Sequence, residues 1–303
     1  MKKRVVYLNG EYLEESKAKL SIYDRGFLFG DAVFEAGRTF NHKPFKLKEH
    51  IDRLFRSLRY TRIEPHLTPR EINDITLEVL KVNDENLAPN DDFIYYQRVS
   101  RGEGLYMSHY PIIEPTILIY CQPIDFKSFA QQYFQGIHLI MATTRHLPSA
   151  CLDPRVKVQS RIVNIMADLE VKTVDPSAYA LMLDIHGFLS EGPSFNIFIT
   201  RGHKLFTPRS NSALEGITRQ TILELAEELG MASYETDLSL YDLYNAEEIF
   251  IAATSFEILP VSKLNNKPLT GPIPGPITEQ LISALGKQVG VDIVQRAQSH
   301  LAR

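Results

Sequence analysis

Residues 179–206 read YALMLDIHGFLSEGPSFNIFITRGHKLF, and this stretch decides the fold class. It contains three strand-like runs at Tyr179–Leu183, Asn196–Thr200 and Lys204–Phe206, and short glycine-containing turns follow the first two. Strands joined by such short turns pair antiparallel, because a parallel connection needs a crossover of about a dozen residues or more. The stretch therefore argues against a Rossmann crossover and predicts antiparallel or mixed sheets.

The rest of the chain mixes strands and helices. Asn9-Gly10 lies between two short strand-like runs and predicts a hairpin, and 29–40 reads as a second extended region. Thr68-Pro69-Arg70-Glu71 has the capping Thr, the early Pro and the Glu of a helix start. Further helices are expected at 51–58, 162–169 and 218–229, and strands at 93–99, 116–121 and 137–142. The fold class is α+β, with flanking helices.

Length and composition set the domain count and the class of protein. A chain of 303 residues, at roughly 100–200 residues per domain, predicts two domains. We expect a smaller N-terminal α/β domain at 1–123, a linker at 124–136 and a larger C-terminal domain at 137–303. The linker is suggested because PIDFKSFAQQYFQG (123–136) lacks strand alternation and ends in glycine.

Charge and cysteine content exclude several classes. The formal net charge of −4 argues against a dedicated nucleic-acid binder, which normally carries a basic excess. Two cysteines make no disulfide framework, and the first residues lack the apolar core of a signal peptide. No apolar stretch approaches the roughly 18 residues of a membrane span. We expect a cytoplasmic protein with no membrane partner.

Lys157 is the first candidate for chemistry. It lies between Val156 and Val158, so in an extended segment both valines point to one face and the lysine to the other. A lysine in a partly dry setting is a good Schiff-base nucleophile. Most lysines are solvated surface ions, so the spacing alone does not decide whether Lys157 is a Schiff-base lysine or an ordinary surface lysine.

Three segments of the second half offer groups that suit a phosphorylated aromatic aldehyde. Glu191 lies in a Gly/Pro/Ser turn, and a carboxylate facing a pyridine nitrogen keeps such a ring protonated. Gly216 precedes a helix start, where free backbone N–H groups bind anions and Thr218 adds a hydroxyl. Thr254 and Ser255 follow an apolar run and offer further donors. A plain polar turn and an ordinary helix cap remain open as alternatives. No metal-ligand spacing occurs, and we expect no metal.

Taken in order, these segments resemble the class IV aminotransferases, the branched-chain-type family with fold type IV of the pyridoxal phosphate enzymes. The resemblance extends from Gly30-Asp31-Ala32-Val33-Phe34-Glu35 and Glu49-His50-Ile51-Asp52-Arg53-Leu54 in the first half to the second. There it rests on SEGPSFNIF (190–198), Thr207-Pro208, LEGITR (214–219) and Thr254-Ser255. It covers essentially the whole chain.

The resemblance implies a cofactor, pyridoxal 5'-phosphate, and roles for individual residues. Lys157 matches the Schiff-base lysine and Glu191 the partner of the pyridine nitrogen. The residues that match the phosphate site are Arg53, Ile217, Thr218 and Thr254 or Ser255. The implied activity is transamination between an amino acid or primary amine and a 2-oxo acid. Lys157 acts there as general base, with ping-pong kinetics. The family usually completes its pocket from a second subunit, so a homodimer or larger homo-oligomer is expected.

The substrate remains open between several branches of the family. D-amino-acid enzymes carry an Arg-x-His carboxylate trap after Thr-Arg-Gly, whereas Tyr106 and Ser108 stand at those positions here. Branched-chain enzymes have Asn-Tyr after the lysine, whereas this chain has Arg161-Ile162. Arg145-His146-Leu147-Pro148 is closer to the (R)-amine branch. An aminodeoxychorismate lyase and a non-catalytic binding relative are the further alternatives.

Arg38 is the candidate for selectivity. Alternation along the predicted strand puts Phe34, Ala36 and Arg38 on one face and Glu35 on the other. An arginine in an apolar pocket is favourable when it meets a substrate carboxylate. We expect Phe29, Phe34 and Tyr95 to form the apolar wall of that pocket. The alternative is a structural ion pair between Arg38 and Glu35 or Glu49.

Overall fold

The computed structural model describes residues 3–104 and 114–301 and divides the chain into two compact units. The first unit comprises the described residues up to Ile124 together with Val156–Ser160. The second comprises Asp125–Arg155 and the described residues from Arg161 onward. Tyr106 and Ser108 lie outside the described residues. Within the described part of the chain, no helix combines the length and the apolar character needed to cross a bilayer.

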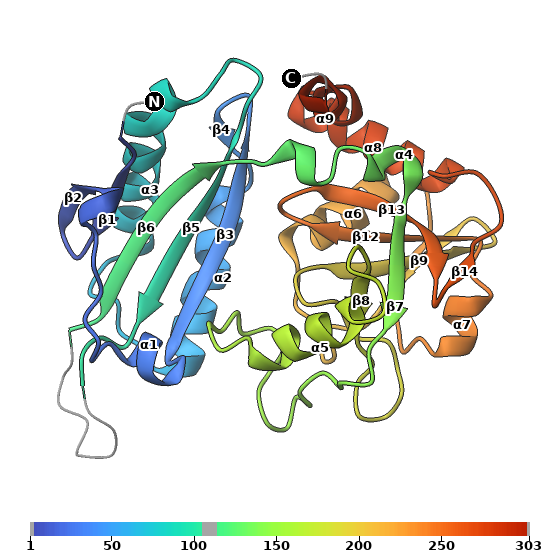
Figure 1. Cartoon of the computed structure of the whole chain (residues 1–303), viewed down its shortest axis with the longest axis horizontal. Helices are drawn as coiled ribbons and strands as arrows, with labels where there is room; N and C mark the ends of the chain where they lie inside the picture. The colour runs from blue at the N-terminus through green and yellow to red at the C-terminus, as the bar shows by residue number, and fades with distance from the viewer. Residues whose placement is uncertain (1–2, 105–113, 302–303) are drawn as a thin grey trace. The chain divides into compact units, whose positions relative to one another are not determined.

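The first unit is built on a six-stranded antiparallel sheet of order β2-β1-β6-β5-β3-β4 (Figure 1). Its strands are β1 (Val5–Leu8), β2 (Glu11–Glu14), β3 (Ala32–Phe40), β4 (Lys43–Pro44), β5 (Phe93–Ser100) and β6 (Thr116–Pro123). The predicted hairpin is confirmed: β1 pairs with β2, and Asn9 and Gly10 have φ values of 48° and 98°. Both values suit the two-residue turn that such a hairpin needs.

Two long helices cover one face of this sheet, behind the strands in Figure 1. α2 (Leu47–Thr61) contacts β3, and α3 (Pro69–Asn83) contacts β6. The predicted start of α3 is confirmed, because Thr68 and Glu71 form a reciprocal capping box. The apolar stripe of α2, which includes Ile51, Leu54 and Leu58, is buried in the core of the unit. The short helices are α1 (Arg25–Phe29), η1 (Glu15–Lys17) and η2 (Asp84–Asn86).

The extended region predicted at 29–40 is wrong at its start. Residues 25–29 form α1, because Asp24 caps the helix by accepting from the N–H of Gly26. Gly30 ends the helix at φ 69°. Phe29 is therefore the last residue of a helix and does not lie on the strand. Its side chain is 44 % exposed.

The second unit is built on an eight-stranded mixed sheet. Its path is β11-β10-β9-β12-β13-β7-β8, and β14 pairs with β13. The strands are β7 (Ile137–Met141), β8 (Tyr179–Leu181), β9 (Asn196–Arg201), β10 (Lys204–Thr207), β11 (Ser233–Glu235), β12 (Glu248–Ala253), β13 (Glu257–Leu264) and β14 (Lys267–Pro268). The predicted antiparallel pairing of β9 with β10 is confirmed. The pairing expected between the runs at 179–183 and 196–200 is wrong, because β8 pairs in parallel with β7 and β9 lies between β10 and β12. β7 also runs parallel to β13. The α+β fold class is confirmed.

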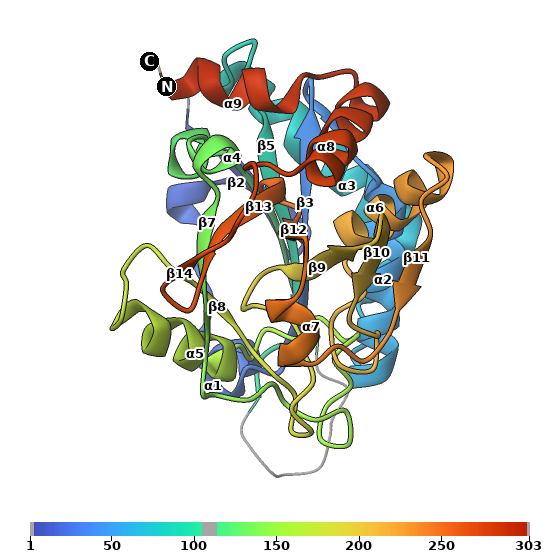
Figure 2. The same ribbon diagram turned by 90° about the vertical axis from the view of Figure 1, so that its right-hand side faces the viewer.

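Helices surround this second sheet. They are η3 (Phe126–Ser128), α4 (Gln132–Gln135), α5 (Ile162–Lys172), α6 (Ile217–Glu228), α7 (Leu240–Tyr244), α8 (Pro276–Val289) and α9 (Ile293–Leu301). Figure 2 shows α5 beside β8, and α6 beside α8, and both pairs are in contact. α6 begins after a glycine N-cap, so no side chain caps its first turn.

The segment expected to be a linker folds onto the second unit. Phe126, Phe129 and Tyr133 are buried, and the ring of Phe129 lies 6.3 Å from that of Phe256. The hydroxyl of Tyr133 donates to the carbonyl of Phe256 over 2.6 Å. The free energy gained by burying these rings outweighs the entropy lost when the segment becomes ordered. The segment is therefore part of the second unit and not a flexible linker.

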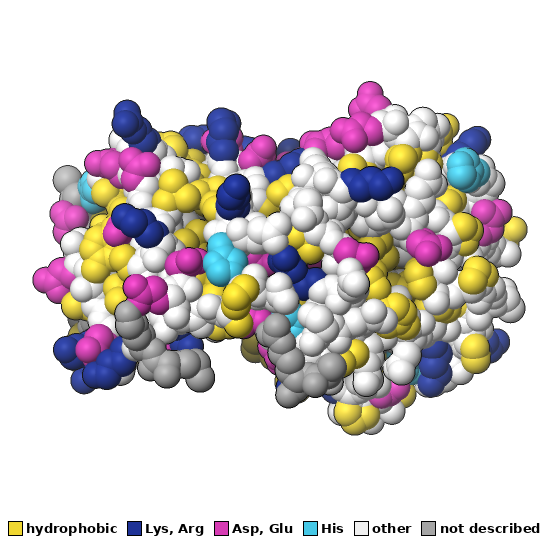
Figure 3. Space-filling model, turned by 90° about the horizontal axis from the view of Figure 1, so that it is seen from above, with side chains coloured by type: hydrophobic (Ala, Val, Ile, Leu, Met, Phe, Trp, Pro, Cys, Tyr) yellow, Lys and Arg dark blue, Asp and Glu magenta, His cyan; other side chains and the backbone are white. Residues whose placement is uncertain are grey.

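Charged side chains of both signs are interspersed on the molecular face seen in Figure 3. No basic stripe of the kind that binds nucleic acid is visible on that face. The distribution agrees with the formal net charge of −4.

Candidate functional site

Lys157 lies on a short extended segment that pairs with the start of β3. The N–H of Phe34 donates to the carbonyl of Lys157 over 3.0 Å, and the N–H of Lys157 donates to Oγ of Ser57 over 3.1 Å. Val156 and Val158 pack on the apolar core of the first unit, as their alternation predicts. The lysine side chain turns the other way, and its Nζ lies 4.7 Å from the centroid of the Phe34 ring.

An aromatic and cationic cluster shares a sheet face with Phe34. Phe34 pairs with Arg98, and Tyr96 pairs with Tyr120, so these side chains lie on the same side of β3, β5 and β6. Cζ of Arg98 lies 5.1 Å from the Phe34 ring centroid and 5.3 Å from that of Tyr96. Arg98 also donates to the hydroxyl of Tyr120 over 3.1 Å and to Oε1 of Gln159. A hydrophobic wall with one cation in it therefore borders Lys157.

Sequence reasoning missed Arg98 and Tyr96, and chose Tyr95 in their place. Tyr95 pairs with Gly37, so it lies on the opposite face of the sheet from Phe34. Its side chain is fully buried under α2, with its ring 6.4 Å from that of His50. Alternation within β5 separates Tyr95 from Tyr96 and Arg98, but the sequence does not tell which parity matches that of Phe34. Tyr95 is thus a core residue of the first unit.

Arg38 lies on the Phe34 face, as alternation along β3 predicts, but it is only 3 % exposed. Its Nε donates to the carbonyl of Thr39 over 3.2 Å, and its Cζ lies 4.2 Å from the centroid of the Phe40 ring. The carboxylate of Glu35, a predicted partner of Arg38, is bound instead by Arg53 and His50. These contacts favour a structural role for Arg38 near the end of β3.

Arg53 forms a buried ion pair with Glu35, on the α2 side of the sheet. Its Nε and Nη2 donate to the two carboxylate oxygens over 2.7 and 2.8 Å, in the bidentate geometry that fixes a guanidinium plane. His50 adds a hydrogen bond of 2.8 Å between its Nδ1 and Oε2 of Glu35. Burial would raise the pKa of Glu35, but Arg53 and His50 outweigh it and hold that pKa well below its usual range. Arg53 itself is buried within the first unit.

Glu191 lies in the second unit, in the loop before β9. Its Oε2 accepts from the backbone N–H of Leu214 over 2.8 Å and from Nδ2 of Asn196 over 3.2 Å. Asn196 also donates to the carbonyl of Leu214 over 2.9 Å, so it ties the two loops together. The Glu191 side chain is 7 % exposed. This donor set suits an ionised carboxylate that is held in one orientation.

The start of α6 suits an anion. Gly216 is the N-cap, and Ile217 and Thr218 open the helix one residue earlier than predicted. No side chain caps this helix, in contrast to the capping box of α3, so the first N–H groups keep the dipole that attracts a phosphate. Gly216 lies so close to Asn196 that a Cβ atom there would clash with its side-chain oxygen. The Glu191 loop and the start of α6 are thus brought together.

Thr254 and Ser255 occupy the turn between β12 and β13, and both are partly buried. Glu257 follows at φ 56°, in the left-handed region that tight turns use. Of the residues predicted for the cofactor, the first unit carries Arg53 and Lys157. The second carries Glu191, Ile217, Thr218, Thr254 and Ser255.

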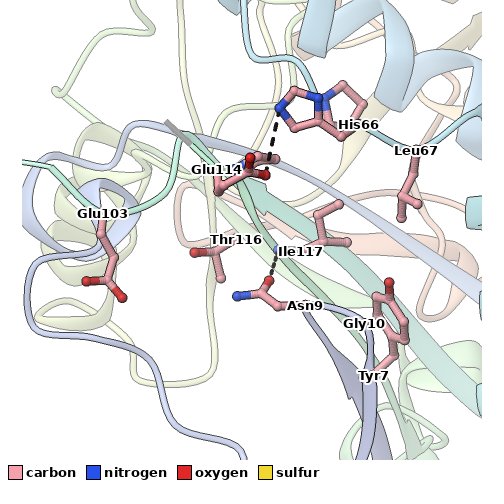
Figure 4. Close-up of a pocket in the computed structure, with 11 residues that line it drawn as sticks. Tyr7, Asn9, Gly10, His66, Leu67, Glu103, Glu114, Thr116 and Ile117 are labelled. Carbon is pink, nitrogen blue, oxygen red and sulfur yellow. Dashed lines mark hydrogen bonds and ion pairs between the residues drawn. The ribbon is translucent and has the colours of Figure 1, made fainter. Parts of the chain in front are cut away.

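A cavity of about 730 Å³ in the first unit contains none of these residues (Figure 4). His66 and Glu114, whose charged atoms are 3.9 Å apart, line it together with Asn9 and Glu103. Among the described residues that line it there are two carboxylates and no lysine or arginine, which makes it unsuited to a phosphate. The cavity is therefore not the predicted cofactor site.

Comparison with known proteins identifies the family. The model of the family described as amino-transferase class IV matches residues 32–264. A protein of Methanocaldococcus jannaschii provisionally named branched-chain-amino-acid aminotransferase is 38 % identical over 91 % of this chain and 93 % of its own. A D-alanine aminotransferase of Bacillus licheniformis is 30 % identical over 94 % of this chain and 96 % of its own.

The fold agrees with these similarities. The crystal structure of the branched-chain amino acid aminotransferase of Escherichia coli superposes with a TM-score of 0.88 at 26 % identity, covering 94 % of each chain. This is the fold type IV architecture that the ordered motifs imply. Class IV aminotransferases depend on pyridoxal phosphate. The protein described here belongs to the class IV aminotransferases and is an enzyme that transfers amino groups.

Proposed function

We propose that this chain transfers the amino group of a branched-chain amino acid to a 2-oxo acid, with pyridoxal phosphate bound to Lys157. The observation that carries the proposal is the position of Lys157 Nζ, 4.7 Å from the Phe34 ring. The ring shields the amine on one side and leaves it next to an apolar surface. A lysine in such a setting is a good nucleophile toward an aldehyde.

Several residues of this chain fit the cofactor. Glu191, held by Leu214 and Asn196, would pair with the pyridine nitrogen. The uncapped start of α6 would bind the phosphate through the N–H groups of Ile217 and Thr218. By resemblance, Arg53, Thr254 and Ser255 would complete that phosphate site. When bound, the cofactor supplies an aromatic ring that withdraws electrons from the substrate carbon.

Lys157 then has two tasks. Its Nζ would hold the cofactor and, when not bonded to it, would serve as the general base that takes the proton from the substrate carbon. The segment's backbone bonds to Phe34 and Ser57 fix where the side chain starts, so the amine returns to the same place. The two half-reactions imply ping-pong kinetics.

The cluster beside Lys157 supports a branched-chain substrate. Phe34, Tyr96 and Tyr120 offer an apolar wall for an aliphatic side chain, and Arg98 offers a cation for a carboxylate. The 38 % identity to the M. jannaschii protein points the same way. Tyr95 lies on the opposite face of the sheet and is not part of this wall, and the carboxylate role passes from Arg38 to Arg98.

A D-amino-acid donor is the second candidate, because the B. licheniformis D-alanine aminotransferase is 30 % identical over nearly the whole chain. A panel of L-leucine, D-alanine and (R)-1-phenylethylamine, each with 2-oxoglutarate or pyruvate, separates the candidates. We expect L-leucine to be used best. Faster turnover of D-alanine or of the amine would overturn the branched-chain assignment. Pyruvate release without a second oxo acid would indicate a lyase.

Lys157→Ala tests the central assignment. The wild-type protein should be yellow, and borohydride should fix the cofactor on Lys157, as peptide mass mapping would show. Lys157→Ala should lose transamination, whereas the control Lys172→Ala, an exposed lysine of α5 paired with Asp168, should keep it. Full activity of Lys157→Ala would contradict the proposal.

We also propose that the protein is a homodimer. α5 exposes an apolar stripe of side chains that are at least half exposed, namely Ile162, Ile165, Met166 and Leu169. Contiguous apolar surface of this kind marks an interaction site, and a C2 partner is the commonest. Leu169→Glu should shift the sedimentation coefficient toward the monomer. Ile185→Glu, at an exposed apolar residue outside the stripe, should not.

A cytoplasmic location is proposed on the cysteines. Cys121 and Cys151 are both free, and Cys151 is exposed, which suits a reducing compartment. Fractionation of cells with an antibody to the protein would test it, and enrichment in the secreted fraction would contradict it.

A further inference from the structure

The two oxygens of Glu191 have different surroundings. Oε2 accepts both neutral hydrogen bonds, from Leu214 and Asn196. Oε1 lies 3.5 Å from Nε2 of His146, a residue of the loop that follows β7. The pair is shielded from water, since the side chains of His146 and Glu191 are 12 % and 7 % exposed. Oε2 is therefore fixed by groups that do not titrate, and Oε1 faces one that does.

The hydrogen bonds of His146 fix which of its nitrogens faces Glu191. Its backbone N–H donates to the carbonyl of Leu183 over 2.9 Å, which anchors the loop. Its Nδ1 lies 3.0 Å from the carbonyl of Leu147, which can only accept, so Nδ1 carries a hydrogen. In the neutral imidazole Nε2 would then point a lone pair at a carboxylate. In the imidazolium it donates a hydrogen to Oε1, which is the favourable arrangement.

The charged groups that face His146 are Glu191 and Arg161 at the N-cap of α5. Burial and the charge of Arg161 lower the pKa of His146. The hydrogen bond and charge of Glu191, with the Leu147 carbonyl, outweigh them, so the net pKa is raised. Arg161 donates to the carbonyl of Pro193, in the same loop as Glu191. Glu191 thus has one cation that titrates near neutral pH and one that does not.

We propose that His146 is a positioning residue that acts through Glu191 and controls how much of its negative charge is available to the pyridine nitrogen of the cofactor. The proposal rests on the assignment of Glu191 in the proposed function. A protonated His146 shares Oε1 and reduces the charge that meets the ring. Loss of that proton leaves the carboxylate, still held through Oε2, entirely to the ring. Activity should therefore rise with pH through the titration of His146.

The first experiment needs no cofactor. Histidine ring signals of cofactor-free protein labelled with ¹³C-histidine are followed against pH, and the His146 signal is assigned by its loss in His146→Gln. We expect His146 to titrate above the usual value of about 6.5 and to become about tenfold more acidic in Glu191→Gln. Equal titration of His146 in the wild type and in Glu191→Gln would overturn the proposal.

The second experiment measures the pH dependence of kcat/KM. His146→Gln keeps a polar side chain without a titrating proton, so the acid limb that belongs to His146 should disappear. The control is His203→Asn, an exposed histidine at φ 58° in the β9–β10 turn, a conformation that asparagine tolerates. An acid limb retained in His146→Gln would overturn the proposal, because a merely structural residue leaves the profile in place.

The two claims fail in different ways. A wild-type protein that takes up no pyridoxal phosphate overturns the proposed function, and with it the role of His146 toward the cofactor. A protein that binds the cofactor at Lys157, but in which His146 does not respond to Glu191→Gln, overturns the inference alone.

Discussion

The side-chain oxygen of Asn196 lies where a Cβ atom on Gly216 would have to be, so residue 216 can only be glycine without a shift of Asn196. Asn196 is also one of the two donors to Oε2 of Glu191. Close packing at the start of α6 is therefore coupled to the orientation of the Glu191 carboxylate.

Gly216→Ala should weaken cofactor binding by at least tenfold, because Asn196 must move and release Glu191. The dissociation constant for pyridoxal phosphate can be measured by absorbance titration. Gly230→Ala is the control: at φ 68° an alanine is strained, but its Cβ atom meets nothing within 4 Å. If both variants bind the cofactor equally well, Asn196 does not orient Glu191.

Glu35→Gln should destabilise the first unit by about 3–5 kcal/mol, because it leaves the buried Arg53 without its partner charge. The pKa of Glu35 is held below its usual range, so the folded state resists the proton that the unfolded state accepts. This contribution to stability is present above about pH 4.3 and is lost as the pH falls. Burial lowers the pKa of His50, which adds a loss in the same direction from about pH 6.5 downward.

Urea unfolding from pH 7 to well below pH 4.3 measures both effects. Below about pH 4.3 the wild type should lose more stability than Glu35→Gln, because only the wild type has the Glu35 carboxylate to protonate. Lys48→Ala, which removes an exposed and solvent-screened pair with Asp52 on α2, should leave stability nearly unchanged and follow the wild-type pH dependence. Parallel curves for wild type and Glu35→Gln would show that the ion pair does not titrate on unfolding.

Tyr95→Phe should leave activity unchanged and keep or raise the melting temperature. The hydroxyl of Tyr95 is buried and has no hydrogen-bond partner among the described residues, so removing it relieves an unpaired polar group. Tyr96→Phe, on the Phe34 face of the same strand, is the matched variant for which kinetic effects are expected. A change of donor preference in Tyr95→Phe would place that residue in the substrate site after all.

Arg98→Met should raise KM for 2-oxoglutarate more than KM for 4-methyl-2-oxopentanoate, because only the first has a second carboxylate to bind. The selective loss should be about 1.5–3 kcal/mol, the range of a charged hydrogen bond. Arg38→Ala is the comparison, and we expect it to lower the melting temperature without changing this ratio. A selective loss in Arg38→Ala and not in Arg98→Met would restore Arg38 as the carboxylate ligand.

Much of the fold could be predicted from local signals. The β1–β2 turn, the cap of α3 and the apolar stripe of α2 each depend on residues close together in sequence, and the structure confirms all three. The valines beside Lys157 also pack as alternation indicates. The ordered motifs gave the family, which the family model and the relatives confirm.

The predictions that failed concern features that depend on contacts between residues distant in sequence. Whether Tyr95 or Tyr96 shares a face with Phe34 is decided by the register of β3 with β5, which no local pattern reveals. The burial of Phe129 depends on Phe256, more than a hundred residues later, so its segment was mistaken for a linker. Phe29 does not lie on the predicted strand, because Asp24 caps a short helix that ends at Phe29.

The affiliation of Val156–Ser160 with the first unit has a consequence for recombination among relatives. The chain leaves the first unit after Ile124, comes back for these five residues, and leaves again. A chimera made at a single crossover near residue 124 would join the β3 strand of one parent to the lysine segment of another. To exchange the first unit intact, both of its segments, the one up to Ile124 and Val156–Ser160, must come from the same parent. Chimeras with a single crossover near residue 124 should therefore be active less often than chimeras in which both segments are exchanged together.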